Sequence, residues 1–194
     1  MNIGLKEKLL EMSANDARVR DELAKTGELF DGYCPKMERI QLANAADLEN
    51  IVDEYGWTGK TLVGAAGAAA AWLIVQHTIS LPAFSRKCLK LIENAVAENE
   101  AEPYQAAYLH DRIAFFERKP QRYGTQSDWN TDGKMQVWTL ENPEKVNEFR
   151  ADIGLKPIVN LIWESAETNE NVPPDFAARQ KIFEDWLKKV GWLD

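Results

Sequence analysis

The sequence is poor in the residues that most metal sites use, with only two histidines and two cysteines among 194 residues. Cys34 and Cys88 can form at most one disulfide and lack the spacing of metal-binding cysteines, so we expect two free thiols in a reducing compartment. A metal-assisted site would rest on His77 with Asp16 and Asp111, a set with a single histidine. The single histidine makes a metal-assisted site the weaker version, so we assign no metal ligands, and the sequence leaves the cofactor unknown.

Long apolar runs and clusters of basic residues are also scarce. The most apolar stretch, residues 62–75, has 14 residues, whereas a membrane-spanning helix needs about 20. The N-terminus lacks the basic segment and apolar segment of a secretory signal. The net charge is −8, which disfavours nucleic acid and anionic membranes, because binding phosphate chains needs concentrated Lys and Arg. We expect a cytoplasmic protein that binds a small polar ligand or a protein partner.

What the chain does contain is helical periodicity, which predicts a mainly α, single-domain helical bundle over residues 1–194. Residues 62–77 are rich in Ala and Gly and apolar on nearly every side, which predicts a central, buried helix. A turn at residues 130–133 predicts a small β-hairpin insertion at 121–140, between residues 123–129 and 134–140. Helices are expected at residues 4–25, 37–55, 62–77, 82–98, 103–118, 143–153 and 173–190, with Asn44 as a candidate break in the second.

Residues Gly59, Lys60 and Thr61 match the end of a phosphate-binding loop. The full pattern requires a glycine five residues before Gly59, where the sequence has Glu54, and no strand precedes it. We therefore do not predict a nucleotide site.

A dense run of polar side chains at residues 121–126 follows a helix that carries Asp111. Asp111 falls on an aromatic side of that helix, where a carboxylate must be hydrogen-bonded or ion-paired. Asp16 has the same problem on the apolar stripe of the first helix, where Arg20 is one candidate partner. His77, at the end of the central helix, is another group that suits a carboxylate. We expect one polar cluster made of Asp16, His77, Asp111, Gln121 and Gln126.

This cluster predicts a site that binds or hydrolyses a small polar ligand. His77 would act as acid or base, and Asp111 would orient it. His110 is expected to face solvent. The residues expected to hold the ligand are Asp16, Arg112, Gln121, Tyr123, Thr125 and Gln126.

The alternative hypothesis is a non-catalytic interaction module of a regulatory, defence or immunity type. Its polar cluster would be structural, and its acidic surface would recognise a protein partner. The acidic balance and the lack of established catalytic motifs favour this alternative, whereas the polar cluster and its loop favour a binding or hydrolytic site.

Several segments resemble an uncharacterised bacterial family known only as a domain of unknown function. The resemblance spans residues 10–160, and its most specific segment is Gln121-x-Tyr123-Gly124-Thr125-Gln126. The other matching residues are Asp16 with Arg20, Tyr55-Gly56-Trp57, Gly64, Gln76-His77, Leu109, Asp111-Arg112, Arg150, Gly154-Leu155 and Pro157. The resemblance implies where a site lies and no particular chemistry.

The chain departs from this family at three positions. It has Thr58 where proline is usual, and Thr78 and Ile79 where a small residue and an acid are usual. The missing acid weakens the case for His77 as a metal ligand.

Overall fold

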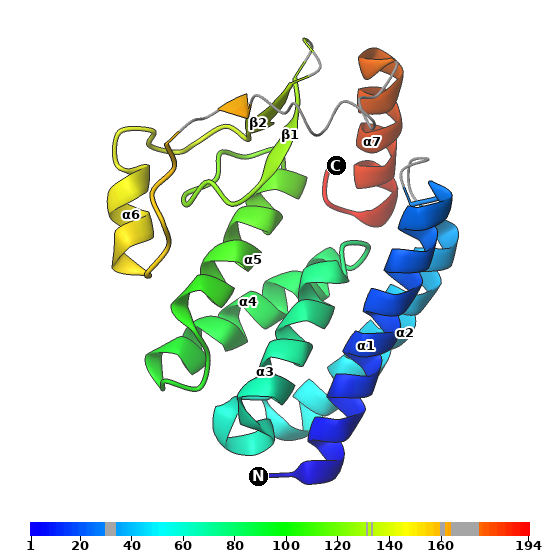
Figure 1. Ribbon diagram of the computed structural model, residues 1–194, viewed down its shortest axis with the longest axis vertical. Coiled ribbons are helices and arrows are strands. Elements are labelled where there is room, and N and C mark those ends of the chain that lie inside the picture. The colour runs from blue at the N-terminus through cyan, green and yellow to red at the C-terminus, as the bar shows by residue number, and fades with distance from the viewer. Residues whose placement is uncertain (30–33, 131, 133, 160–161, 164–174) are drawn as a thin grey trace. The chain divides into compact units, whose positions relative to one another are not determined.

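The computed structural model describes residues 1–29, 34–130, 132, 134–159, 162–163 and 175–194. The chain divides into two compact units, Met1–Glu102 and Pro103–Asp194. Within the described residues it forms seven helices and three short strands (Figure 1). The prediction of a mainly α protein with a small hairpin is confirmed, and the single-domain organisation stays a prediction.

Four helices make up the first unit: α1 (Ile3–Thr26), α2 (Pro35–Tyr55), α3 (Lys60–His77) and α4 (Pro82–Ala97). α1 and α2 lie side by side (Figure 1). The candidate break at Asn44 is wrong, because α2 continues through it. The Asn44 side chain is buried and donates to the Met12 carbonyl of α1 at 3.4 Å. Since its amide has a partner on another helix, Asn44 does not compete for the backbone of α2.

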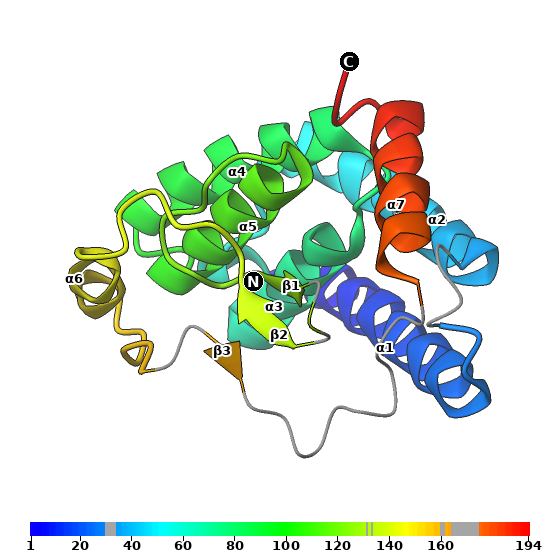
Figure 2. The same cartoon turned by 90° about the horizontal axis from the view of Figure 1, so that it is seen from above.

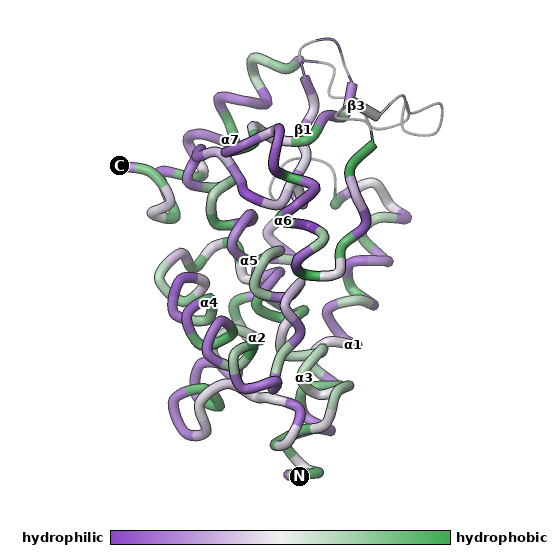
Figure 3. The backbone as a smooth tube through the Cα atoms, turned by 90° about the vertical axis from the view of Figure 1, so that its left-hand side faces the viewer, coloured by the Kyte–Doolittle hydropathy of each residue, from purple (hydrophilic) through white to green (hydrophobic). Residues whose placement is uncertain are grey.

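α3 is the central helix of this unit and packs against α1, α2 and α4. The expectation of burial on every side is only partly right, because Ala65, Ala66 and Ala69 are exposed. Gly64 interrupts α3 with φ 71° and ψ 166°, a conformation that a residue with a side chain rarely adopts. Along α4, short polar and apolar stretches follow one another (Figure 3), as expected for a helix with one buried face.

The second unit contains a helix, a small sheet and two further helices. Its elements are α5 (Pro103–Phe116), β1 (Ser127–Trp129), β2 (Met135–Val137), α6 (Val146–Asp152), β3 (Ile162–Trp163) and α7 (Phe176–Val190). β2 lies between β1 and β3, and both pairings are antiparallel (Figure 2). The hairpin is where the sequence predicted it, with shorter strands that pair Ser127 with Val137 and Trp129 with Met135.

Aromatic rings form the apolar interior of this unit. Phe183 and Trp186 of α7 are stacked with ring centres 5.8 Å apart, and Phe116 of α5 lies 5.3 Å from the ring of Trp192. Asp175 begins α7 by accepting from the Ala178 amide at 2.9 Å. Residues 131, 133, 164–171 and 173–174, which carry part of the predicted turn, a predicted loop and the predicted start of this helix, lie outside the described residues.

Candidate functional site

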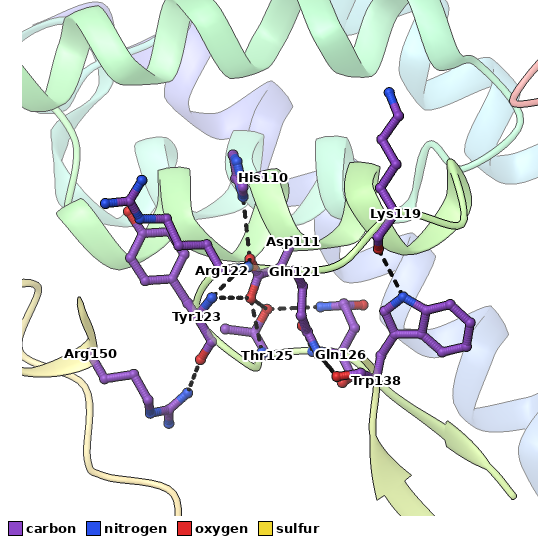
Figure 4. Close-up of polar contacts among 10 residues, drawn as sticks. All are labelled: His110, Asp111, Lys119, Gln121, Arg122, Tyr123, Thr125, Gln126, Trp138 and Arg150. Carbon is purple, nitrogen blue, oxygen red and sulfur yellow. Dashed lines mark hydrogen bonds and ion pairs between the residues drawn. The ribbon is translucent and has the colours of Figure 1, made fainter. Parts of the chain in front are cut away.

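Asp111 lies on α5 and is fully buried, at 0% exposure. The chain leaves α5 and returns beneath it as a loop at residues 121–126, whose backbone amides point at the Asp111 carboxylate (Figure 4). An ionised carboxylate accepts hydrogen bonds only, so an isolated one would be costly to bury. The loop meets this requirement because it presents several N–H groups to the same side chain.

Both oxygens of Asp111 accept hydrogen bonds from the loop. Oδ1 accepts from the amides of Arg122 at 2.9 Å and Tyr123 at 3.1 Å. Oδ2 accepts from the amides of Tyr123 at 3.1 Å and Thr125 at 3.0 Å, and from the Thr125 hydroxyl at 3.1 Å. The carboxylate therefore fixes the shape of the loop and has its hydrogen-bonding capacity largely filled by it.

Gln121 closes the same loop from its other end. Its side-chain Nε2 donates to the carbonyls of Gln126 at 2.8 Å and Trp138 at 2.9 Å, while its Oε1 accepts from the Gln126 amide at 2.8 Å. The Gln126 side chain donates to the Thr125 hydroxyl at 3.1 Å. Gln121, itself fully buried, thus ties the loop to the residue that follows β2.

Glycine is required at the bend of this loop. Gly124 has φ 66°, and a β-carbon there would collide with the side chain of Ile158. Arg150 supports the bend from outside, donating to the Tyr123 carbonyl at 2.7 Å and to the Lys156 carbonyl at 2.6 Å. The Gln-x-Tyr-Gly-Thr-Gln segment is therefore a built structure, in which each polar residue holds a backbone group or another side chain.

Asp16 and His77 form a second polar group, in the first unit. The Asp16 side chain is buried and His77 is 18% exposed. His77 Nδ1 lies 2.5 Å from Asp16 Oδ1. Because an ionised carboxylate can only accept, Nδ1 carries the hydrogen of this bond and Nε2 is left as the basic nitrogen.

In this second group, two polar atoms have no hydrogen-bond partner within the described residues. Asp16 Oδ2 is buried and meets no hydrogen-bond partner within the described residues. Within the same residues no hydrogen bond is made to His77 Nε2. Arg20, the other candidate partner of Asp16, is exposed on α1, so the expected Asp16–Arg20 pair is replaced by a pair between two helices.

The predicted site residues thus form two groups. Asp16 joins His77, while Gln121, Tyr123, Thr125 and Gln126 gather around Asp111. Arg112 lies next to Asp111 on α5 and is half-buried. The meeting of both groups in one cluster, and the catalytic and ligand-binding roles, stay predictions.

The sequence interpretation missed three residues of the Asp111 group: His110, Trp138 and Arg150. His110 was expected to face solvent, and its side chain is 41% exposed, but its Nδ1 also lies 3.3 Å from Asp111 Oδ1, a contact that was not expected. The indole of Trp138 donates to the Lys119 carbonyl at 2.9 Å. Arg150 was part of the family resemblance, which could have indicated its place beside the Tyr-Gly-Thr bend; nothing in the sequence pattern indicated the other two.

The start of α3 explains why Gly59, Lys60 and Thr61 do not form a phosphate site. Glu100 accepts hydrogen bonds from the Thr61 amide at 2.7 Å and from the Thr61 hydroxyl. A carboxylate therefore occupies the helix N-terminus, where a phosphate-binding loop would hold its anion. These hydrogen bonds lower the pKa of Glu100, and Lys60 adds a smaller effect in the same direction.

Three further sequence expectations concern cysteines, metals and membranes. Cys34 and Cys88 are free thiols, as predicted. In the part of the chain that the structure describes, no three His, Cys, Asp or Glu side chains are grouped to hold a metal ion. None of the helices described is both long and apolar enough to cross a membrane.

Comparison with known proteins adds a family and no activity. A model of a family of unknown function, DUF6624, matches residues 3–168. No curated protein and no solved structure matches the chain. Because the family model covers most of the chain and includes both polar groups, the expected resemblance is confirmed: the chain belongs to the DUF6624 family of unknown function.

Proposed function

We propose that this protein binds or hydrolyses a small polar ligand at a site in which His77 is the acid–base group and Asp16 orients it. The observation that carries the proposal is the 2.5 Å contact between His77 Nδ1 and a buried Asp16 carboxylate. A buried carboxylate on one imidazole nitrogen fixes the ring and its tautomer, and leaves the other nitrogen available for proton transfer. The sequence-based role of Asp111 as the orienting acid thus passes to Asp16.

In the hydrolytic form, His77 Nε2 takes a proton from water as the water oxygen attacks an electrophilic centre of the ligand. The same proton then passes from Nε2 to the leaving group as its bond breaks. Asp16 keeps its negative charge throughout and stabilises the imidazolium that forms in between. Partial exposure of the His77 ring suits this role, because a group sealed from solvent could not reach a ligand.

In this proposal the Asp111 group has a structural role: it holds the loop at residues 121–126. Its carboxylate is engaged by three backbone amides and one hydroxyl of the loop, so a ligand would have to displace existing hydrogen bonds to contact it. Because the hydrogen-bonding capacity of Asp111 is filled, the alternative hypothesis is favoured for the second unit. In that hypothesis the polar cluster is structural and the protein is an interaction module that binds a protein partner.

The test replaces His77 with Gln, which keeps a donor for Asp16 but cannot transfer protons. His110→Gln is the matched control, since it changes the other histidine. Both variants and the wild type are incubated with p-nitrophenyl esters, phosphates and glycosides, and release of p-nitrophenol is measured. Binding of nucleotides, sugars and amino acids is measured in parallel by thermal shift.

We expect His77→Gln to reduce hydrolysis of the accepted substrate by about 100-fold or more, the usual contribution of a positioned acid–base group. Asp16→Asn should reduce it less, and His110→Gln should leave it unchanged. For a ligand that is bound without hydrolysis, His77→Gln should abolish its thermal shift. If His77→Gln only lowers the melting temperature, and retains both turnover and ligand shifts, the pair is structural and the interaction-module hypothesis is preferred.

A further inference from the structure

A surface cleft of about 530 Å³ lies in the first unit, at the end of α3 opposite to His77. It is formed by the turn between α2 and α3, the first turn of α3 and the C-terminal end of α4. Its lining includes Tyr55, Trp57, Leu91, Glu98 and Glu100. The Tyr55-Gly56-Trp57 segment belongs to the family resemblance, and the proposal for His77 gives it no role.

Two aromatic side chains and several apolar ones form the walls of the cleft. Tyr55 is 45% exposed, which is high for a large ring, and Trp57 is half-buried. Leu62 and Leu91 add apolar surface. The faces of tyrosine and tryptophan rings carry partial negative charge and attract organic cations.

The charged side chains that line the cleft are all acidic. They are Glu98, which is exposed at the end of α4, and Glu100. Among the described residues, no lysine, arginine or histidine side chain lines it, although Met1, which carries the amino terminus, does. The nearby Lys60 is paired with Glu102 at 2.7 Å. A glutamate carboxylate is ionised at neutral pH, and the Thr61 hydrogen bonds lower the pKa of Glu100 further.

A third feature is a hydrogen-bond donor without an acceptor. The indole N–H of Trp57 is buried and has no hydrogen-bond partner within the described residues. A buried donor of this kind is costly unless an acceptor reaches it. Because Trp57 lines the cleft, this N–H group is a reporter of ligand binding there.

We propose that this cleft binds a small organic ammonium ion, with Glu98 and Glu100 supplying the opposite charge and the rings of Tyr55 and Trp57 contacting its alkyl groups. Aromatic rings beside carboxylates are the combination that recognises quaternary and primary ammonium groups. The site stands apart from the proposed function at His77, since it is built from other residues at the other end of α3.

The test compares two probes of the same shape. Choline carries a quaternary ammonium group, and 3,3-dimethyl-1-butanol replaces its nitrogen with carbon and keeps the hydroxyl group. Each is titrated into ¹⁵N-labelled protein, and the indole N–H resonance of Trp57, assigned by its loss in Trp57→Phe, is followed by NMR. Glu98→Gln tests the charge of the cleft, and Glu93→Gln on the same helix, whose side chain does not line the cleft, is its matched control.

We expect choline to shift the Trp57 resonance in a saturable manner, with the neutral analogue binding at least about tenfold more weakly. Glu98→Gln should weaken choline binding severalfold, while Glu93→Gln and His77→Gln leave it unchanged. The proposal is overturned if choline leaves the Trp57 resonance in place, or if both probes bind equally well. It is also overturned if Glu93→Gln weakens binding as much as Glu98→Gln, because net charge would then explain the effect. An unchanged result in His77→Gln separates this site from the proposed acid–base site.

Discussion

Asp111 and Asp16 are both helical carboxylates with almost no exposed surface, yet their surroundings differ. Asp111 accepts hydrogen bonds from three amides and a hydroxyl of one loop. Asp16 has one partner, His77, and an oxygen that meets no donor within the described part of the chain. Buried polar groups normally have hydrogen-bond partners. A carboxylate whose oxygens are all hydrogen-bonded therefore indicates a structural role, whereas one with an unpaired oxygen indicates a functional site that is kept at a cost in stability.

The largest expected difference between the two carboxylates is in stability, when each aspartate is replaced with asparagine. Asp111→Asn turns an NH₂ group toward donors of the loop and should lower the free energy of unfolding by about 2–4 kcal/mol. Asp16→Asn keeps an acceptor for His77 and removes a buried charge, so its effect should stay within about 1 kcal/mol. Urea denaturation of both variants measures the difference. Equal losses would show that hydrogen-bond saturation does not separate the two carboxylates.

The neutral part of the loop provides the next largest effect. Gln121→Ala removes three side-chain hydrogen bonds of a fully buried residue, and should cost about 2–3 kcal/mol of unfolding free energy. Gln126→Ala removes a single side-chain bond to Thr125 and should cost less than about 1 kcal/mol. Thermal and urea denaturation give both values. A larger loss for Gln126→Ala would contradict the assignment of Gln121 as the residue that closes the loop.

Glu100 tests a carboxylate that has donors but is only partly buried. Because its pKa is lowered in the folded protein, its contribution to stability is present above the unfolded pKa of about 4.5 and is lost as the pH falls through the lower folded value. Glu100→Gln should therefore lower the melting temperature at pH 7 by less than the changes above. The difference from wild type should shrink below pH 4.5.

Glu98→Gln is the control for this effect, because Glu98 is exposed and caps no helix start. It should change the melting temperature little at either pH. The melting temperature of Glu100→Gln could instead differ from that of wild type by the same amount at pH 7 and at low pH. The Thr61 hydrogen bonds would then not stabilise the ionised form of Glu100.

The two cysteines extend the comparison to thiols that differ in burial, and here the measured quantity is reactivity rather than stability. Burial raises the pKa of the Cys88 thiol to about 12, whereas Cys34 is only half-buried. When the native protein is treated with a thiol reagent at pH 8, the reagent should modify Cys34 first and Cys88 much more slowly. The thiolate is the reactive form, and the raised pKa of Cys88 leaves little of it at this pH. Mass spectrometry identifies the modified residue, and denatured protein, in which both react, is the control. Equal rates in the native protein would show that Cys88 is accessible.

Local sequence signals predicted most of the elements because they act over a few residues. Gly27 and Gly56 follow the residues where α1 and α2 end, and the turn signal predicted a hairpin that forms between β1 and β2. Asn44 misled the interpretation, because its hydrogen bond to Met12 comes from a helix 32 residues away. Propensity describes the isolated segment, and a partner from another element can override it.

The sequence by itself determined that Asp16, His77 and Asp111 needed polar partners, since the helical period places the two carboxylates among apolar side chains. It also determined that the Gln-x-Tyr-Gly-Thr-Gln segment would be a shaped loop. Only the tertiary structure decided that His77 pairs with Asp16, and that Asp111 accepts from amides of a loop whose first donor, Arg122, lies 11 residues later. The physical reason is that burial follows from the period of one helix, whereas the identity of a hydrogen-bond donor depends on which other segments the folded chain brings within about 3 Å.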